Sequence, residues 1–275
     1  MGNPYVISAE LDLSTAYLGQ IIEQDRVEGF RESLDADLRA MGKETLWVPA
    51  STIQSGIEKS MAKTNLPLVS LDQRYVSTAD QFLGISRGID PLLNDDGYVP
   101  RNGYPSIDQQ LRKVPYLGNE VMLIDDVLFS GEMVAWLSDS LKPYGVKIGA
   151  LVVGIAIQEG IDKLALEGID VEAGEVFNEV EDEICERDFA VVPGSGRRID
   201  ALAANALYFD SDNGKPERWA SISPESVKSF CLDSIKRSID LLKPGISMQG
   251  LGAFLGYGTV GAADTQLARR LGEIL

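Results

Sequence analysis

Apolar runs of strand length alternate along this chain with segments of helical periodicity, and that alternation constrains the fold more than any other feature. The strand candidates are Thr45–Ala50, Leu66–Val76, Glu120–Ile124 and Val146–Ile157, of which the last is continuously apolar, as strands at the centre of a parallel sheet are. Loops and helical segments separate these candidates. The repeated order of strand, loop and helix predicts an α/β fold with a mainly parallel sheet flanked by helices.

Helical segments are identified by apolar residues that recur every three or four positions and by the residues that end helices. Pro143 and Gly145, for example, stop the helix that begins at Glu132. The predicted helices are Gln20–Met41, Ile57–Asn65, Glu132–Lys142, Ser223–Leu242 and Asp264–Leu275. Ser51–Gly56 is predicted to be a loop, and Phe189–Val192 a further short strand.

Two stretches determine the predicted domain organisation. Gly84–Gly118 is rich in Gly and Pro, and so long an irregular segment usually serves as a lid or an insertion. Residues 206–275 have the helix Ser223–Leu242 as their clearest element. We therefore expect an α/β domain over residues 1–205, with the lid at about 84–118, and a C-terminal helical extension over residues 206–275.

Composition excludes several kinds of chemistry. The chain has no histidine, which removes imidazole catalysis and most zinc sites and leaves carboxylates, Lys, Arg, hydroxyls, backbone amides or an oxygen-bound metal. A net charge of −17 disfavours nucleic acids and anionic membranes as partners. Cys185 and Cys231 lack metal-ligand spacing and are expected to be reduced thiols of a cytoplasmic protein. No signal peptide or membrane-spanning segment is expected.

The segment most informative about function is Val121–Met133, with the sequence VMLIDDVLFSGEM. An apolar strand is followed by two adjacent carboxylates, Asp125 and Asp126, then by a short turn with Ser130 and Gly131, and then by a helix. Ligands of parallel α/β sheets bind at the carboxyl ends of the strands, where the amides of the next helix favour an anion. This arrangement suits a sugar phosphate, with hydroxyls or a metal at the carboxylates and phosphate at the helix.

This segment resembles the phosphoribosyl pyrophosphate motif of type I phosphoribosyltransferases. The resemblance implies that Asp125 and Asp126 contact the ribose hydroxyls and hold Mg²⁺, directly or through water, as the catalytic carboxylates. It also implies that the backbone from Val127 to Met133 wraps the 5-phosphate. The residues of that loop are Val127, Leu128, Phe129, Ser130, Gly131, Glu132 and Met133. The family often has a hydroxyl residue where this chain has Met133.

The same resemblance makes Thr45–Ala50 the strand before a pyrophosphate loop, Ser51–Gly56 that loop, Gly84–Gly118 the lid and Phe189–Arg198 the segment that closes the sheet. The loop contains no Lys or Arg, so pyrophosphate binding needs other cations. We therefore expect Ser51, Thr52 and Arg74 to form the pyrophosphate site. Weaker candidates are the lid residues Arg87, Arg101, Arg112 and Lys113.

Three functions are compatible with these residues. The first is Mg²⁺-dependent transfer of phosphoribose from phosphoribosyl pyrophosphate to an unidentified nitrogenous acceptor, with release of pyrophosphate, by a cytoplasmic homodimer. The second is a sensor that binds a ribose 5-phosphate ligand without catalysis and regulates a partner. The third is a phosphoribosyl hydrolase or a variant that forms carbon–carbon bonds.

Three further segments are less specific. The acidic run Glu179–Asp188 is expected to be a solvated face, with a second Mg²⁺ site as the alternative. Pro193–Arg198 (PGSGRR) is either an anion-binding turn or a plain surface turn. Gly250–Gly261 lacks a preceding strand and the Lys-Ser/Thr ending of a phosphate loop, so close packing or an oligomer contact is expected there.

Overall fold

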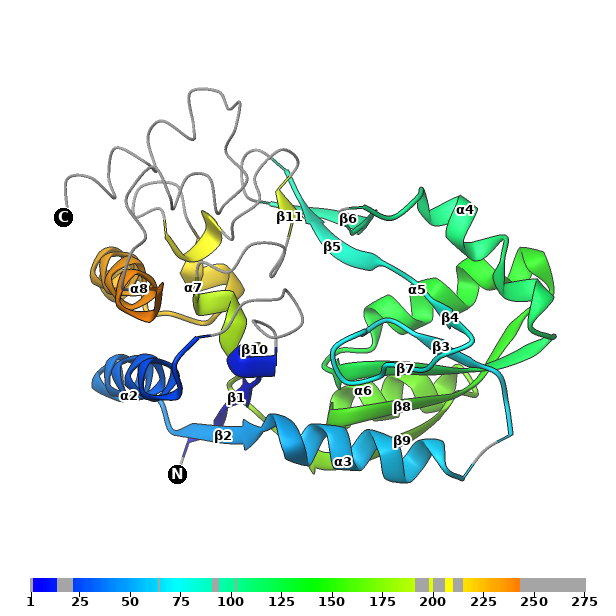
Figure 1. Ribbon diagram of the computed structural model, residues 1–275, viewed down its shortest axis with the longest axis horizontal. Coiled ribbons are helices and arrows are strands. Elements are labelled where there is room, and N and C mark those ends of the chain that lie inside the picture. Colours follow the sequence, from blue (N-terminus) through cyan, green and yellow to red (C-terminus); the bar gives the residue numbers. More distant parts are fainter. Residues whose placement is uncertain are drawn as a thin grey trace. The chain divides into compact units, whose positions relative to one another are not determined.

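A computed structural model describes residues 2–13, 22–63, 65–90, 94–101, 103–190, 198–199, 206–209 and 215–242 (Figure 1). They form two compact units. The first unit comprises the described residues of Met1–Trp47, Arg87–Gly97 and Glu181–Leu275, and the second comprises those of Val48–Ser86 and Tyr98–Val180. Each unit therefore combines segments that are distant in sequence.

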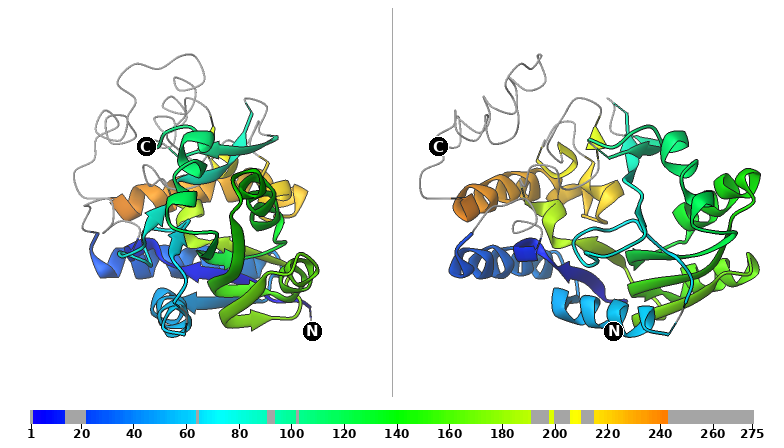
Figure 2. Two further views of the ribbon diagram at one scale, coloured as in Figure 1. Left: turned by 90° about the vertical axis from the view of Figure 1, so that its right-hand side faces the viewer. Right: turned by 45° about the vertical axis from the view of Figure 1, so that its right-hand side comes forward.

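The second unit is built on a five-stranded sheet in which every neighbouring pair of strands is parallel. Its strands, in spatial order, are β4 (Gln81–Phe82), β3 (Leu68–Ser70), β7 (Glu120–Leu128), β8 (Lys147–Ile157) and β9 (Asp170–Phe177). The sheet lies between helix α3 (Ala50–Met61) on one face and α5 (Glu132–Leu141) and α6 (Gln158–Leu166) on the other (Figure 2). The predicted α/β fold with a parallel sheet flanked by helices is confirmed.

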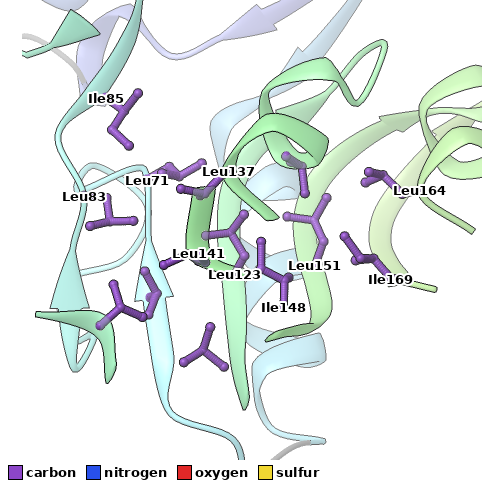
Figure 3. Close-up of a cluster of buried hydrophobic side chains, with 14 of the residues drawn as sticks. Leu71, Leu83, Ile85, Leu123, Leu137, Leu141, Ile148, Leu151, Leu164 and Ile169 are labelled. Carbon is purple, nitrogen blue, oxygen red and sulfur yellow. The ribbon is translucent and has the colours of Figure 1, made fainter. Parts of the chain in front are cut away.

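The core of the second unit lies between this sheet and the helices α5 and α6. Figure 3 shows Leu123 of β7 and Leu151 of β8 packed with Leu137 and Leu141 of α5 and Leu164 of α6. All five side chains are almost fully buried. Burial of a leucine contributes roughly 1.5–3 kcal/mol, so this cluster holds β7 and β8 against α5 and α6.

The expected loop Ser51–Gly56 is wrong, because helix α3 begins at Ala50 and includes it. Ile53 and Ile57 are fully buried at helical spacing and anchor the helix to the sheet. Gly56 does not end the helix. A Cβ at this position would lie 2.5 Å from the Cα of Gly174 in β9. This glycine permits close approach of helix α3 to strand β9. In the sequence, a glycine required for such an approach cannot be distinguished from a glycine in a loop.

Two other expectations are corrected. The strand predicted over Leu66–Val76 is limited to β3, because the carboxylate of Asp72 accepts hydrogen bonds from the amides of Arg74 and Tyr75 and turns the chain. Gly84–Gly118 is not irregular throughout. It contains β5 (Ile85–Ile89), β6 (Asp95–Pro100), α4 (Ile107–Leu111) and the 3₁₀ helix η1 (Val114–Tyr116).

The helix predicted over Glu132–Lys142 and the strand predicted over Val146–Ile157 are confirmed as α5 and β8. A 3₁₀ turn, η2 (Lys142–Tyr144), joins them. The sequence did not predict α6 or β9, which follow β8 directly. Strand β9 lies at the edge of its sheet, and the acidic residues Asp170, Glu172 and Glu175 interrupt its apolar residues, so it gives no apolar run.

The first unit contains the sheet β10–β1–β2, in which β1 (Tyr5–Ala9) pairs in parallel with β10 (Asp182–Cys185). Strand β2 (Thr45–Pro49), expected before a pyrophosphate loop, belongs to this sheet rather than to the five-stranded one. The short strand β11 (Arg198–Ile199) belongs to a third sheet, in the order β11–β5–β6.

Helices α2 (Gln24–Ala40) and α8 (Val227–Leu242) pack together in the first unit and confirm the helices predicted over Gln20–Met41 and Ser223–Leu242. Three short helical segments, η4 (Ala206–Tyr208), α7 (Pro216–Trp219) and η5 (Pro224–Ser226), precede α8. The strand predicted over Phe189–Val192 is wrong at Phe189, which ends the 3₁₀ helix η3 (Glu186–Phe189). The predicted boundary at residue 205 stays a prediction.

Several expectations lie outside the described residues, namely most of Pro193–Arg198, Gly250–Gly261 and the helix Asp264–Leu275. Cys185 and Cys231 form no disulfide. No helix among the described residues is long and apolar enough to cross a membrane.

Candidate functional site

The two adjacent carboxylates lie inside strand β7 rather than after its end. Asp125 pairs with Val153 of β8, and the strand continues to Leu128, which pairs with Ala156. The expected strand end at Ile124 is therefore wrong, because β8 is long enough to extend the pairing. Asp125 is 5% exposed and the side chain of Asp126 14% exposed, so both carboxylates are largely removed from water.

A third carboxylate, Asp72, reaches the same edge of the sheet from the neighbouring strand. Ser70 at the end of β3 pairs with Ile124 of β7, and the amide of Leu71 donates a hydrogen bond to the carbonyl of Ile124. Asp72 follows directly and is 1% exposed. Asp72 is not among the site residues predicted from the sequence; the signal that could have found it is that parallel strands bring the residues after their ends to one edge.

Two arginines neutralise these carboxylates. Arg74 donates from Nε to Oδ2 of Asp72 at 2.9 Å and also forms an ion pair with it, while its Nη2 lies 3.6 Å from Oδ2 of Asp126. The charge of Arg101 acts on Asp72, Asp125 and Asp126. Nε of Arg101 donates to the carbonyl of Ile85 at 3.0 Å, which fixes this side chain in place. The site is thus a cluster of three carboxylates and two guanidinium groups.

Burial and charge divide the protons unequally among the carboxyl groups. Burial raises the pKa of Asp125 well above its ordinary value, and the charges of Asp126 and Asp72 raise it further. Burial also raises the pKa of Asp126, with a further contribution from Asp72 that Arg74 opposes. Burial acts in the same direction on Asp72, but the charge and hydrogen bonds of Arg74 outweigh it and lower that pKa. A proton in the cluster therefore prefers Asp125 to Asp72.

The turn after β7 leads the chain into helix α5. Gly131 has φ 73° and ψ 2°, the left-handed conformation that favours glycine, and it is the N-cap of α5. The side chain of Phe129 is exposed, that of Ser130 is partly exposed, and Oγ of Ser130 accepts a long hydrogen bond of 3.5 Å from the amide of Glu132. The amides of a first helical turn have no partner within their own helix, so this end of α5 favours an anion.

The turn is held by close packing on α6. A Cβ at Gly160 in α6 would lie 2.2 Å from the carbonyl oxygen of Phe129, so only glycine allows this approach. A Cβ at Gly131 would meet Leu164 and the carbonyl of Gly160 at 3.2 and 3.3 Å. The loop predicted to wrap a phosphate thus includes a tight turn packed against α6. Met133 is partly buried in the first turn of α5 and packs against the core of the unit.

Ser51 and Thr52 lie in the first turn of α3, whose N-cap is Pro49 and has no side chain that could cap the helix. Ile53, the next residue, lies over Gly154 of β8: a Cβ at Gly154 would be 2.1 Å from its Cγ2. Gly154 lies between Val153 and Ile155, which pair with Asp125 and Val127. The amide end of α3 therefore crosses the sheet at the level of the carboxylate pair, where it too favours an anion.

The other predicted cations are not part of this cluster. Arg87 belongs to the first unit and pairs with Asp95, and Arg112 pairs with Asp108 on the exposed helix α4. Lys113, after α4, is exposed and forms no ion pair in the part of the chain that the structure describes. Of the lid candidates, only Arg101 acts on the carboxylates.

The expectation of a solvated face at Glu179–Asp188 is wrong for its second half. Glu186 is fully buried and accepts hydrogen bonds from Arg31 and from the amide of Leu11, and Asp188 is 8% exposed. Arg187 is buried as well, forms an ion pair with Glu10, and has its pKa lowered by burial to about 10. The acidic run thus ends in an ion-pair network of the first unit, to which Arg31 and Glu10 contribute from elsewhere in the sequence and Arg187 from within the run.

Fold and site together define an α/β protein with a buried cluster of carboxylates at the edge of a parallel sheet, followed by a glycine turn and a helix. No protein-family model and no curated protein sequence matches the chain. Solved structures that resemble part of it include phosphoribosyltransferases, the family that the motif resembles.

Three of these structures differ in how much of each chain is covered. UMP synthase from Leishmania donovani is 13% identical, with 45% of this chain and 26% of that chain covered and a TM-score of 0.29. Adenine phosphoribosyltransferase from Thermoanaerobacter pseudethanolicus is 10% identical, with 45% and 77% covered and a TM-score of 0.30. Orotate phosphoribosyltransferase from Aeropyrum pernix is 14% identical, with 57% and 78% covered and a TM-score of 0.27. The chain thus spans about a quarter of the UMP synthase chain.

Proposed function

We propose that this chain binds phosphoribosyl pyrophosphate at Asp125, Asp126 and the turn from Val127 to Met133, and transfers its phosphoribosyl group to a nitrogenous acceptor. The observation that carries the proposal is the buried carboxylate pair of β7 followed by the left-handed Gly131 at the start of α5. Carboxylates accept hydrogen bonds from vicinal hydroxyls, and the amides after the turn donate to a phosphate.

The proposed reaction replaces one bond at the anomeric carbon. The bond to the pyrophosphate oxygen breaks, the bond to the acceptor nitrogen forms, and that nitrogen loses a proton. Such a transfer requires positioning and exclusion of water more than covalent participation by the protein, so a chain without histidine can carry it out. Asp125 and Asp126 would orient the ribose ring through its hydroxyls.

We include Mg²⁺ in the proposal because the chemistry of the site suits it. Carboxylate oxygens are the ligands that this ion prefers, and Asp125 and Asp126 supply them beside the place of the sugar hydroxyls. When bound, Mg²⁺ would neutralise charge on the departing pyrophosphate. The pyrophosphate itself is proposed to lie near Ser51, Thr52 and Arg74, where the uncapped end of α3 and a guanidinium group supply donors.

Calorimetric titration tests the binding part of this proposal. Phosphoribosyl pyrophosphate with Mg²⁺ is titrated into the wild type, into Asp125→Asn/Asp126→Asn and into Asp139→Asn, which removes a carboxylate from the exposed face of α5. We expect binding by the wild type and by Asp139→Asn and none by the double variant. Folded wild-type protein that binds neither phosphoribosyl pyrophosphate nor ribose 5-phosphate would refute the proposal.

A second candidate function is a sensor that binds the same ligand without catalysis. Two observations favour it: helix α3 occupies the place of the predicted pyrophosphate loop, and Arg74 forms ion pairs with the protein's own carboxylates. Release of pyrophosphate in the presence of nitrogenous bases and amines distinguishes the two. Tight binding without release under any acceptor would favour the sensor. The homodimer and the cytoplasmic location stay proposals, tested by sedimentation and by fractionation of cells.

A further inference from the structure

Asp72 has a role that the motif does not explain. Its Oδ1 accepts hydrogen bonds from the amides of Arg74 at 2.6 Å and Tyr75 at 3.1 Å, and its Oδ2 accepts from Nε of Arg74 at 2.9 Å. Nη2 of Arg74 also donates to Oδ2. One buried carboxylate thus fixes both the turn after β3 and the direction of the guanidinium group.

The guanidinium group held in this way forms ion pairs with two carboxylates but donates hydrogen bonds to Asp72. Arg74 forms its hydrogen bonds with Asp72, whereas its Nη2 is 3.6 Å from Oδ2 of Asp126, beyond hydrogen-bonding distance. With 8% of its side chain exposed, Arg74 is too buried for solvent to compete for it. A buried guanidinium pairs with the carboxylate that reaches it best, so the position of Arg74 depends on Asp72.

We propose that Asp72 is a positioning residue that holds the Arg74 guanidinium beyond hydrogen-bonding distance of Asp126 and so keeps the Asp126 carboxylate accessible to a sugar hydroxyl. The proposal rests on the function proposed above. A ribose hydroxyl and a guanidinium group are both donors and compete for the same carboxylate oxygen. Asp72 decides this competition because it offers Arg74 two hydrogen bonds in a fixed geometry, without occupying the ligand site itself.

Asp72→Asn separates the two tasks of the carboxylate. The asparagine Oδ1 still accepts from the amides of Arg74 and Tyr75, so the turn persists. Its neutral amide group no longer forms an ion pair with the guanidinium, and Asp126 becomes the nearest carboxylate of β7 for Arg74. Arg101 stays bonded to the carbonyl of Ile85 and does not replace the lost partner. We therefore expect the ion pair of Arg74 with Asp126, now 3.6 Å long, to shorten to a direct hydrogen bond that excludes the ligand hydroxyl.

The test uses ribose 5-phosphate, which lacks the pyrophosphate for which Arg74 itself is a candidate ligand. Its dissociation constant is measured by calorimetry for the wild type, Asp72→Asn, Arg74→Met and Asp72→Asn/Arg74→Met. We expect Asp72→Asn to weaken binding by roughly tenfold or more, as the loss of a hydrogen bond to a charged group does. We expect the double variant to bind as tightly as Arg74→Met, because once the guanidinium group is removed no donor competes with the ligand hydroxyl for Asp126, and Asp72 no longer affects binding.

A residue with a purely structural role would give a different pattern. Asp72→Asn would then weaken binding equally in the presence and absence of Arg74, and that outcome would overturn the inference, as would unchanged binding by Asp72→Asn alone. If Asp72→Asn does not fold, a double variant that binds more weakly than Arg74→Met would still overturn the inference, since both variants lack the competing charge. Asp139→Asn is the control for the substitution itself. Failure of the wild type to bind any ribose 5-phosphate ligand would instead remove the proposed function and this inference together.

Discussion

At the scale of single residues, the feature that distinguishes this molecule is a set of carboxylates that have been removed from water beside two guanidinium groups. The ionised form of Asp125 is the least favoured, because burial and two neighbouring carboxylates all raise its pKa. The ionised form of Asp72 is the most favoured, because the charge and hydrogen bonds of Arg74 outweigh the effect of burial and lower its pKa. The two residues therefore contribute to stability with opposite dependence on pH.

Asp125→Asn is expected to stabilise the protein at neutral pH. The folded state raises the pKa of Asp125, so between the ordinary Asp pKa and that raised value the folded protein binds more protons than the unfolded chain. Stability then falls as pH increases through this range, and the asparagine variant does not share the loss. We expect a gain of about 1 kcal/mol at pH 8 and less at pH 4. Urea unfolding at both values, with a chelator present, measures it; a variant less stable than the wild type at pH 8 would contradict the prediction.

Gly131→Ala is expected to destabilise the fold more than Gly145→Ala. Both glycines have positive φ, 73° and 72°, so an alanine at either costs about 1 kcal/mol in backbone strain. Only at Gly131 would the new methyl group also meet neighbours, at 3.2 Å from Leu164 and 3.3 Å from the carbonyl of Gly160, whereas the space at Gly145 is open. The difference between the two variants in the free energy of unfolding, measured with urea, gives the contribution of the contacts that Gly131 makes with Leu164 and Gly160. Equal losses would mean that the turn is loosely packed.

At the scale of elements, close approach of helix α3 to the sheet determines the geometry around the site. Gly154 and Gly174 lie on the strands beneath α3, and each has a neighbour that a Cβ would strike. At Gly154 the neighbour is the side chain of Ile53, while at Gly174 it is the backbone of Gly154 and Gly56. A side chain can move and a backbone in a sheet cannot, so the two sites differ in how strain can be relieved.

We expect Gly174→Ala to destabilise the protein by about 3 kcal/mol and Gly154→Ala by about 2 kcal/mol, as overpacking in a core does. Truncation of Ile53 to alanine removes the Cγ2 atom that the Gly154 methyl would meet at 2.1 Å. The cost of Gly154→Ala should therefore decrease in the Ile53→Ala background, whereas the cost of Gly174→Ala should not. Double-mutant cycles by urea denaturation give both coupling energies. Coupling of similar size at the two glycines would argue against a rigid contact between α3 and β9.

The sequence predicted the elements whose signal is local and missed those whose reason is tertiary. Strand β8 and helix α5 were predicted from an apolar run and a proline-glycine stop, which depend on nearby residues alone. Gly56 was misinterpreted as a loop residue, because the strand that requires it, β9, lies more than a hundred residues further along the chain. Asp125 and Asp126 were found from their motif, while Asp72 was missed because no motif marks it: its hydrogen-bond partners are its own neighbours Arg74 and Tyr75, and only the pairing of β3 with β7 brings it to the edge of the sheet where the motif lies. Such proximity has no local signature in one sequence.

At the scale of the whole molecule, a net charge of −17 opposes compaction. Like charges spread over a folded surface repel one another more than in the expanded chain, and salt screens that repulsion. We expect the melting temperature to rise by several degrees when sodium chloride is increased from about 0.02 M to about 0.2 M. Scanning calorimetry measures it, with sucrose of equal osmolality as the control for excluded solutes. A melting temperature that falls with salt would show that attractive ion pairs outweigh the net charge.

The pairing of β1 with β10 has a consequence for the order in which the chain acquires its structure as it leaves the ribosome. Tyr5 lies opposite Asp182, so β1 has no partner in β10 until the whole segment between them has been synthesised. Strands β3, β7, β8 and β9 and the helices between them are complete by then, because Val48–Ser86 and Tyr98–Val180 precede β10. Contacts between residues distant in sequence form late and local contacts form early. The unit with the candidate site is therefore expected to fold first, while the edge of β1 that pairs with β10 stays unpaired.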